Sequence, residues 1–77
     1  MNQESQHELD CKRLSCPLPI LKTRKAMETL SSGDILKIFC TDPGSVNDMS
    51  SWSNSTGHMI LSSNEEDGTY IYLFQKK

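Results

Sequence analysis

The chain has 77 residues, enough for one hydrophobic core but too few to surround a deep substrate cavity. Ten acidic and eight basic residues give a net charge of −2, which excludes nucleic-acid binding driven by phosphate neutralisation alone. Three cysteines are too few for a disulfide-stapled domain, so we expect a reducing compartment, the cytoplasm.

The N-terminal part predicts a leader and a short strand. Residues 1–6 are polar and are expected to be a disordered leader before a single domain over residues 7–77. They have neither the basic start nor the hydrophobic centre of a signal peptide, and no apolar stretch of the chain approaches the roughly 20 residues of a membrane span. From residue 7 to residue 12, Leu9 and Cys11 alternate with charged residues, which predicts a strand with one buried face.

The next two elements are a helix and a strand. The helix is predicted from Pro17 to about residue 30, and its expected buried stripe consists of Ile20, Leu21, Met27 and Leu30. Ser31, Ser32 and Gly33 end it. The strand follows over residues 34–40, and its expected core face consists of Leu36, Ile38 and Cys40.

A second helix and a terminal hairpin complete the chain. Asp42 before Pro43 is typical of a helix start with Asp42 as the N-cap, and Gly57 is expected to end this helix in a left-handed conformation. The predicted buried stripe consists of Val46, Met49, Trp52 and Thr56. Residues 58–63 and 69–75 then read as a hairpin around a polar turn that ends in Gly68.

The order strand, helix, strand, helix, strand, strand predicts an α/β two-layer sandwich of βαβαββ type, with a mixed four-stranded sheet and both helices on one face. The first two strands are expected to be parallel, because a helix connects them. Alternation also predicts aromatic side chains on the opposite sheet face, at Phe39, Tyr70, Tyr72 and Phe74. Cross-strand packing and partner docking are both open interpretations of this patch.

The segment Ser15-Cys16-Pro17-Leu18-Pro19 carries the strongest chemical signal. Proline is favoured at the first helical position, so Pro17 predicts Cys16 as the N-cap, and Leu18 as an N–H donor open to its thiolate. Pro19 removes another backbone donor from the same turn. A helix N-terminus is partly positive, and nearby cations are expected to add to it, namely Lys12, Arg13 and Lys22. Such surroundings lower a cysteine pKa from about 8.5 to roughly 3.5–7.5.

The other candidate residues have less specific signals. Asp42 is expected to act structurally, as a helix cap near the same sheet edge. Cys11 and Cys40 have two open interpretations: they are core residues, or one is a resolving thiol that discharges a Cys16 persulfide as an internal disulfide. The spacing from Cys11 to Cys16 lacks a second Cys or His pair, so neither a metal site nor a cofactor is expected.

Several motifs resemble the TusA-like sulfur-carrier family of SirA and TusA type: Leu14-x-Cys16-Pro17-x-Pro19, Gly33-Asp34, Asp42-Pro43, Gly57-His58 and Tyr70-x-Tyr72-Leu73. The resemblance covers the domain after the leader. It implies that Cys16 accepts persulfide sulfur from a cysteine desulfurase or another donor protein and passes it to a reactive thiol of an acceptor protein. Transfer-RNA thiolation, molybdenum-cofactor synthesis and sulfur oxidation all use this chemistry. Lys12 and Arg13 stand where many members have a glycine.

Two other classes of function remain open at this stage. A non-catalytic redox or regulatory binding module is the alternative to a carrier, and only a carrier must gain about 32 mass units on Cys16 from a sulfur donor. A stand-alone thiol enzyme is disfavoured, because the sequence offers no deep pocket and no convincing base beside the thiol. Neither direct nucleic-acid binding nor membrane association is expected.

Overall fold

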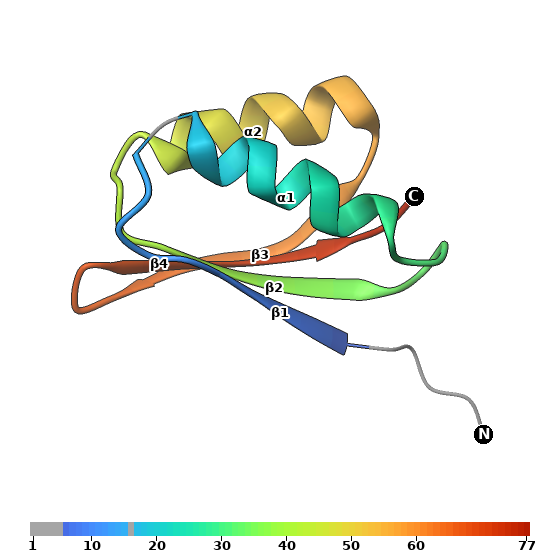
Figure 1. The fold of residues 1–77 in the computed structure, drawn as a ribbon, viewed down its shortest axis with the longest axis horizontal. Helices are drawn as coiled ribbons and strands as arrows, with labels where there is room; N and C mark the ends of the chain where they lie inside the picture. Colours follow the sequence, from blue (N-terminus) through green and yellow to red (C-terminus); the bar gives the residue numbers. More distant parts are fainter. Residues whose placement is uncertain (1–5, 16) are drawn as a thin grey trace.

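The computed structural model describes residues 6–15 and 17–77 and has the predicted element order. The elements are β1 (Gln6–Cys11), α1 (Leu18–Glu28), β2 (Ile35–Cys40), α2 (Ser45–Thr56), β3 (Met59–Glu66) and β4 (Thr69–Gln75). Both helices lie on one face of the sheet, and the other face is left open (Figure 1). The predicted α/β two-layer sandwich is therefore confirmed.

The sheet is mixed, in the strand order β1-β2-β4-β3. β1 and β2 are parallel, and β4 pairs antiparallel with both β2 and β3. β1 is thus an edge strand, and its last residue, Cys11, pairs in register with Cys40, the last residue of β2. Neither described helix is long and apolar enough to cross a membrane.

The core lies between the sheet and the two helices. Its fully buried apolar members are Cys11, Met27, Leu36, Ile38, Cys40, Met49, Tyr72 and Phe74. The predicted core face of β2 is therefore confirmed. The predicted aromatic patch is wrong, because Tyr72 and Phe74 point to the core and only Phe39 lies on the open face. Alternation did not decide this orientation, since residues 70–74 of β4 are all apolar or aromatic.

The predicted buried stripes are confirmed for Met27 and Met49, which are in the core, and for Ile20, Leu30 and Trp52, which pack against it, but they are wrong at Leu21 and Val46. α1 buries Pro19, Thr23 and Met27, whereas Leu21 is 48% exposed. α2 buries Ser45 and Met49, whereas Val46 is 42% exposed. A helix orients by its most favourable total packing, so small polar residues at the right spacing occupy the inner face and displace single apolar ones.

Turns that require a left-handed backbone agree with the prediction. Gly57 ends α2 with φ 87°, as expected of a helix C-cap glycine. The hairpin loop is shorter than predicted, because β3 extends to Glu66 and leaves only Asp67 and Gly68 between the strands. Both have positive φ, 50° and 82°, which is the type I′ arrangement that matches strand twist.

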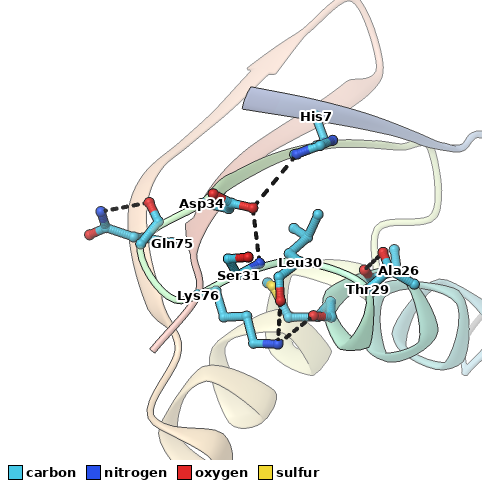
Figure 2. A network of polar contacts seen from close by, with 10 residues as sticks. His7, Ala26, Thr29, Leu30, Ser31, Asp34, Gln75 and Lys76 are labelled. Atoms are coloured by element: carbon cyan, nitrogen blue, oxygen red, sulfur yellow. Dashed lines mark hydrogen bonds and ion pairs between the residues drawn. The ribbon is translucent and has the colours of Figure 1, made fainter. Parts of the chain in front are cut away.

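The C-terminal end of α1 is tied to the end of β4 (Figure 2). The Lys76 ammonium donates to the carbonyls of Met27 and Leu30, at 2.9 and 2.7 Å. Its backbone N–H donates to the Asp34 carbonyl at 2.8 Å, and the Asp34 carboxylate lies 3.8 Å from His7 on β1. These contacts fix the end of the molecule opposite to the loop that contains Cys16.

Candidate functional site

The loops that follow β1 and β2 meet at one edge of the sheet. The backbone N–H of Arg13, in the first loop, donates to the hydroxyl of Thr41, in the second, at 2.9 Å. This agrees with the expectation that both strand-to-helix turns lie at the carboxyl ends of the parallel strands. Cys16 itself lies outside the described residues, so the site is defined by its neighbours.

The start of α1 differs from the prediction by one residue. Pro17 is the N-cap, and its carbonyl accepts from the N–H groups of Ile20 and Leu21 at 3.1 and 3.2 Å. The N–H of Leu18 donates to the Ser15 carbonyl at 2.8 Å. The helix therefore begins one residue later than predicted, and the prediction of Leu18 as an open donor is wrong. Cys16, the predicted N-cap, lies outside the described residues.

The first turn of α1 offers few free N–H groups, so its dipole is the main way in which it would stabilise a nearby anion. Leu18 and Ile20 use their N–H groups in the turn, and Pro19 has none. No side chain caps this end, and the first turn contains no acidic residue. The positive end of the helix is therefore not compensated from within α1, and it favours negative charge nearby.

Two of the three predicted cations, Lys12 and Lys22, make separate contacts. The ammonium of Lys22 donates to the Asp10 carbonyl at 2.8 Å, which joins α1 to the end of β1. The Lys12 ammonium lies 6.0 Å from the ring centre of Phe39, over the open face of the sheet. Roles of Lys12 and Lys22 toward Cys16 therefore remain predictions.

Arg13 has a backbone conformation that suits glycine better. Its φ is 69°, in the left-handed region that side chains with a Cβ rarely adopt. Arg13 is the residue directly before Leu14, where the family resemblance leads one to expect a glycine. The loop thus keeps the glycine geometry although it carries a cationic side chain.

Asp42 stabilises a turn that precedes the second helix. Its carboxylate accepts from the N–H of Gly44 at 3.2 Å, and its carbonyl accepts from the N–H of Ser45 at 2.9 Å. The N-cap of α2 is Gly44, so the prediction of Asp42 as N-cap is wrong. The reason is the Asx-type turn, which uses the carboxylate two residues on and delays the helix.

Cys11 and Cys40 form a buried pair of thiols below these loops. Both are fully buried and neither is in a disulfide. A hydrogen bond from Cys40 lowers the pKa of Cys11, as does the charge of Lys22. The same hydrogen bond, with burial, raises the pKa of Cys40. Cys11 is thus the more acidic thiol of the pair.

A groove beside the Cys16 segment was missed by the sequence analysis. Leu14, Leu18 and Leu21 form its apolar part, and its volume is about 550 Å³. Its rim is mainly basic, with Lys22, Arg24, Lys25 and Glu28. The available signal was the spacing of these leucines next to Lys22 and Lys25, but Leu21 was assigned to the core.

A small two-layer sandwich with a cysteine-proline loop before a helix, beside an apolar groove with a basic rim, defines a thiol-bearing carrier domain. The family profile described as Sulfurtransferase TusA matches residues 7–76. The chain belongs to the TusA family of sulfur carrier proteins.

Individual relatives agree with this assignment. A protein named sulfur carrier protein TusA from Allochromatium vinosum is 44% identical over 69 residues, which cover 90% of this chain and 91% of the relative. The protein of the same name from Pseudomonas putida is 38% identical, covering 90% and 86%. A SirA-like protein from Desulfitobacterium hafniense has a solved structure that matches with a TM-score of 0.78, covering 90% of this chain and 95% of that one. Because the two sequences are only 18% identical, this structural likeness shows a shared fold alone.

Proposed function

We propose that Cys16 accepts persulfide sulfur from a donor protein, such as a cysteine desulfurase, and passes it to the thiol of an acceptor protein. The observation that supports this most is the place of the Cys16-Pro17-x-Pro19 motif, which spans the start of the helix that begins at Leu18. The Cys16 thiolate attacks the terminal sulfur of the donor persulfide, and the donor thiolate leaves. The acceptor thiolate then attacks the terminal sulfur on Cys16, and the Cys16 thiolate leaves.

The positive end of α1 supports both steps of this relay. A thiolate is the nucleophile in the first step and the leaving group in the second, and a helix N-terminus favours the thiolate over the thiol. Pro19 is fully buried and fixes the first turn against the core, while Pro17 is exposed. The motif therefore combines a rigid base with an accessible chain segment.

The groove beside the motif supports docking of a partner with complementary chemistry. Leu18 and Leu21 are each 48% exposed, and Lys22 and Lys25 flank them. Such a surface fits a thiol-bearing partner that presents an apolar side chain within an acidic rim. We place the donor protein here, because the groove adjoins the segment that must reach the donor's persulfide.

The chain is proposed to act as a carrier in a reducing compartment such as the cytoplasm, where thiols stay available. It covers 91% and 86% of the two relatives that are named sulfur carrier protein TusA. Transfer-RNA thiolation, molybdenum-cofactor synthesis and sulfur oxidation remain the candidate pathways, because each needs the same transfer. Capture of the acceptor as a mixed disulfide with Cys16 distinguishes them.

The test is sulfur loading followed by mass spectrometry. With a cysteine desulfurase and cysteine, we expect the chain to gain about 32 mass units on the peptide containing Cys16, and to lose them to an acceptor thiol. Cys16→Ser should keep the fold and accept no sulfur. Cys40→Ser should accept sulfur normally but lose about 1–3 kcal/mol of stability, because it buries a hydroxyl in the core. Loading on Cys11 or Cys40, or no loading at all, contradicts the proposal and favours a regulatory module.

A further inference from the structure

Cys11 and Cys40 are placed to react with each other. They pair in register at the ends of the parallel strands β1 and β2, and both side chains belong to the buried core face. Neighbouring strands lie about 4.8 Å apart, within the Cα separation that disulfides span. The Cys11 thiol donates to the Pro19 carbonyl at 4.0 Å, and Cys40 is the neighbour that lowers the pKa of Cys11 most.

A buried hydroxyl and a nearby cation face this pair from α1. Thr23 is fully buried, and its hydroxyl oxygen has no hydrogen-bond partner among the described residues. Thr23 is among the side chains that lower the pKa of Cys11, so a Cys11 thiolate gives this hydroxyl an acceptor. The charge of Lys22 acts in the same direction, while Asp10 and burial oppose it.

We propose that Cys11 and Cys40 are a second thiol site, which reduces peroxides and closes to a disulfide. The Cys11 thiolate attacks one oxygen of hydrogen peroxide, which gives a sulfenic acid on Cys11 and hydroxide, released as water. The Cys40 thiol then attacks the sulfenic sulfur, and a second water leaves. In total, two thiols lose two electrons and two protons, and the peroxide becomes two waters. This site does not depend on Cys16.

Position in the sheet gives the reagent access and makes the bond reversible. β1 is an edge strand that pairs with β2 alone, so the reagent reaches Cys11 when β1 separates from β2 while the rest of the sheet stays paired. Cβ atoms on neighbouring strands lie farther apart than the roughly 3.5–4.5 Å usual in disulfides. Closure therefore draws the strands together, and a bond under such strain is easily reduced.

The experiment uses the Cys16→Ser chain, which keeps only the two thiols of the site. After treatment of the folded protein with hydrogen peroxide, we expect a loss of about 2 mass units that dithiothreitol reverses, and peptide mapping should show Cys11 linked to Cys40. In Cys16→Ser with Cys40→Ser, the intermediate should accumulate on Cys11 as a gain of about 16 mass units that dimedone traps. An unchanged mass, a link between two chains, or oxidation of Cys11 without a link to Cys40 overturns the proposal.

Thr23 provides a matched control for the chemistry of the site. In the Cys16→Ser background, Thr23→Val keeps the side-chain volume and should slow disulfide formation about tenfold, whereas Thr23→Ser keeps the hydroxyl and should restore the rate. Circular dichroism and thermal melting check that all variants are folded. Equal rates for the valine and serine variants show that Thr23 does not activate Cys11.

Discussion

The hydroxyl groups of Ser45 and Tyr72 lie 2.8 Å apart in a buried hydrogen bond that joins the start of α2 to β4. Both residues are almost completely buried, so each hydroxyl depends on the other for a partner. Burial also raises the pKa of Tyr72. This bond explains why a serine, and not the neighbouring valine, faces the core at the start of α2.

Tyr72→Phe should lower the free energy of unfolding by about 1–3 kcal/mol, because the buried Ser45 hydroxyl loses its partner. Ser45→Ala should cost a similar amount, and the double variant should cost less than the sum of the two. Urea denaturation of all four proteins measures the coupling. Strictly additive losses would show that the two hydroxyls do not interact.

Cys16 should be the thiol that a limiting alkylating reagent modifies first. Cys11 and Cys40 are fully buried, so the reagent reaches them only when the structure opens. Mass-spectrometric mapping over time gives the order of the three sites. Faster modification of Cys11 or Cys40 in the native protein would contradict the assignment of Cys16 as the carrier thiol.

Removing the cations of the first loop should slow sulfur exchange without unfolding the domain. The variant Lys12→Gln with Arg13→Gly is suited to this test, because glycine adopts the positive φ of residue 13 at no cost. We expect the exchange rate to fall about two- to tenfold at low salt, and the difference to shrink at ~0.15 M ionic strength, where the screening length is about 8 Å.

The control for this variant is Lys77→Gln, since Lys77 is an exposed cation at the opposite end of the chain. It should leave the exchange rate unchanged. Equal rates for the loop variant and the natural chain at low salt would mean that Lys12 and Arg13 neither activate the thiol nor steer docking.

His58 should make stability depend on pH in mildly acidic solution. Its Nδ1 accepts from the N–H of Lys77 at 3.0 Å, and burial, with the charges of Lys76 and Lys77, lowers its pKa below the ordinary 6.5. The unfolded chain therefore binds a proton more readily, so this stabilisation is complete above pH 6.5 and is lost as the pH falls through the lowered value.

His58→Asn keeps an acceptor near the position of Nδ1 but does not titrate. The difference in unfolding free energy between the natural chain and this variant should therefore narrow as the pH falls from 7 to 5. Chemical denaturation at several pH values measures it. A difference that is constant with pH would show that His58 has the same pKa in both states.

The sequence predicted correctly those features that one local pattern of residues defines. Leu36, Ile38 and Cys40 alternate with less apolar residues and mark the core face of β2, and Gly57 marks the end of α2. Where a strand is apolar at every position, its sequence does not show which residues face the core. β4 is apolar at each position from Tyr70 to Phe74, so only its pairing with β2 decides that Tyr72 faces the helices.

The first helix was predicted to start one residue early and the second two residues early, for a physical reason. Pro17 and Asp42 are typical of helix starts, but in each loop a short turn forms first, closed by Leu18 to Ser15 and by Ser45 to Asp42. The carboxylate of Asp42 accepts from the N–H of Gly44, so an aspartate before a proline is compatible with a turn as well as with a helix N-cap. The groove at Leu18 and Leu21 was missed because Leu21 was assigned to the core.

Lys76 changes the balance of the α1 helix dipole. Its ammonium donates to the carbonyl of Met27, in the last turn of that helix, and to that of Leu30 just after it, where the partial negative charge of the dipole is concentrated. The negative end of α1 is therefore offset by a basic side chain that follows β4, whereas no acidic residue of its own first turn offsets the positive end. Acetylation of Lys76 would restore the negative pole and turn α1 back into an ordinary dipole.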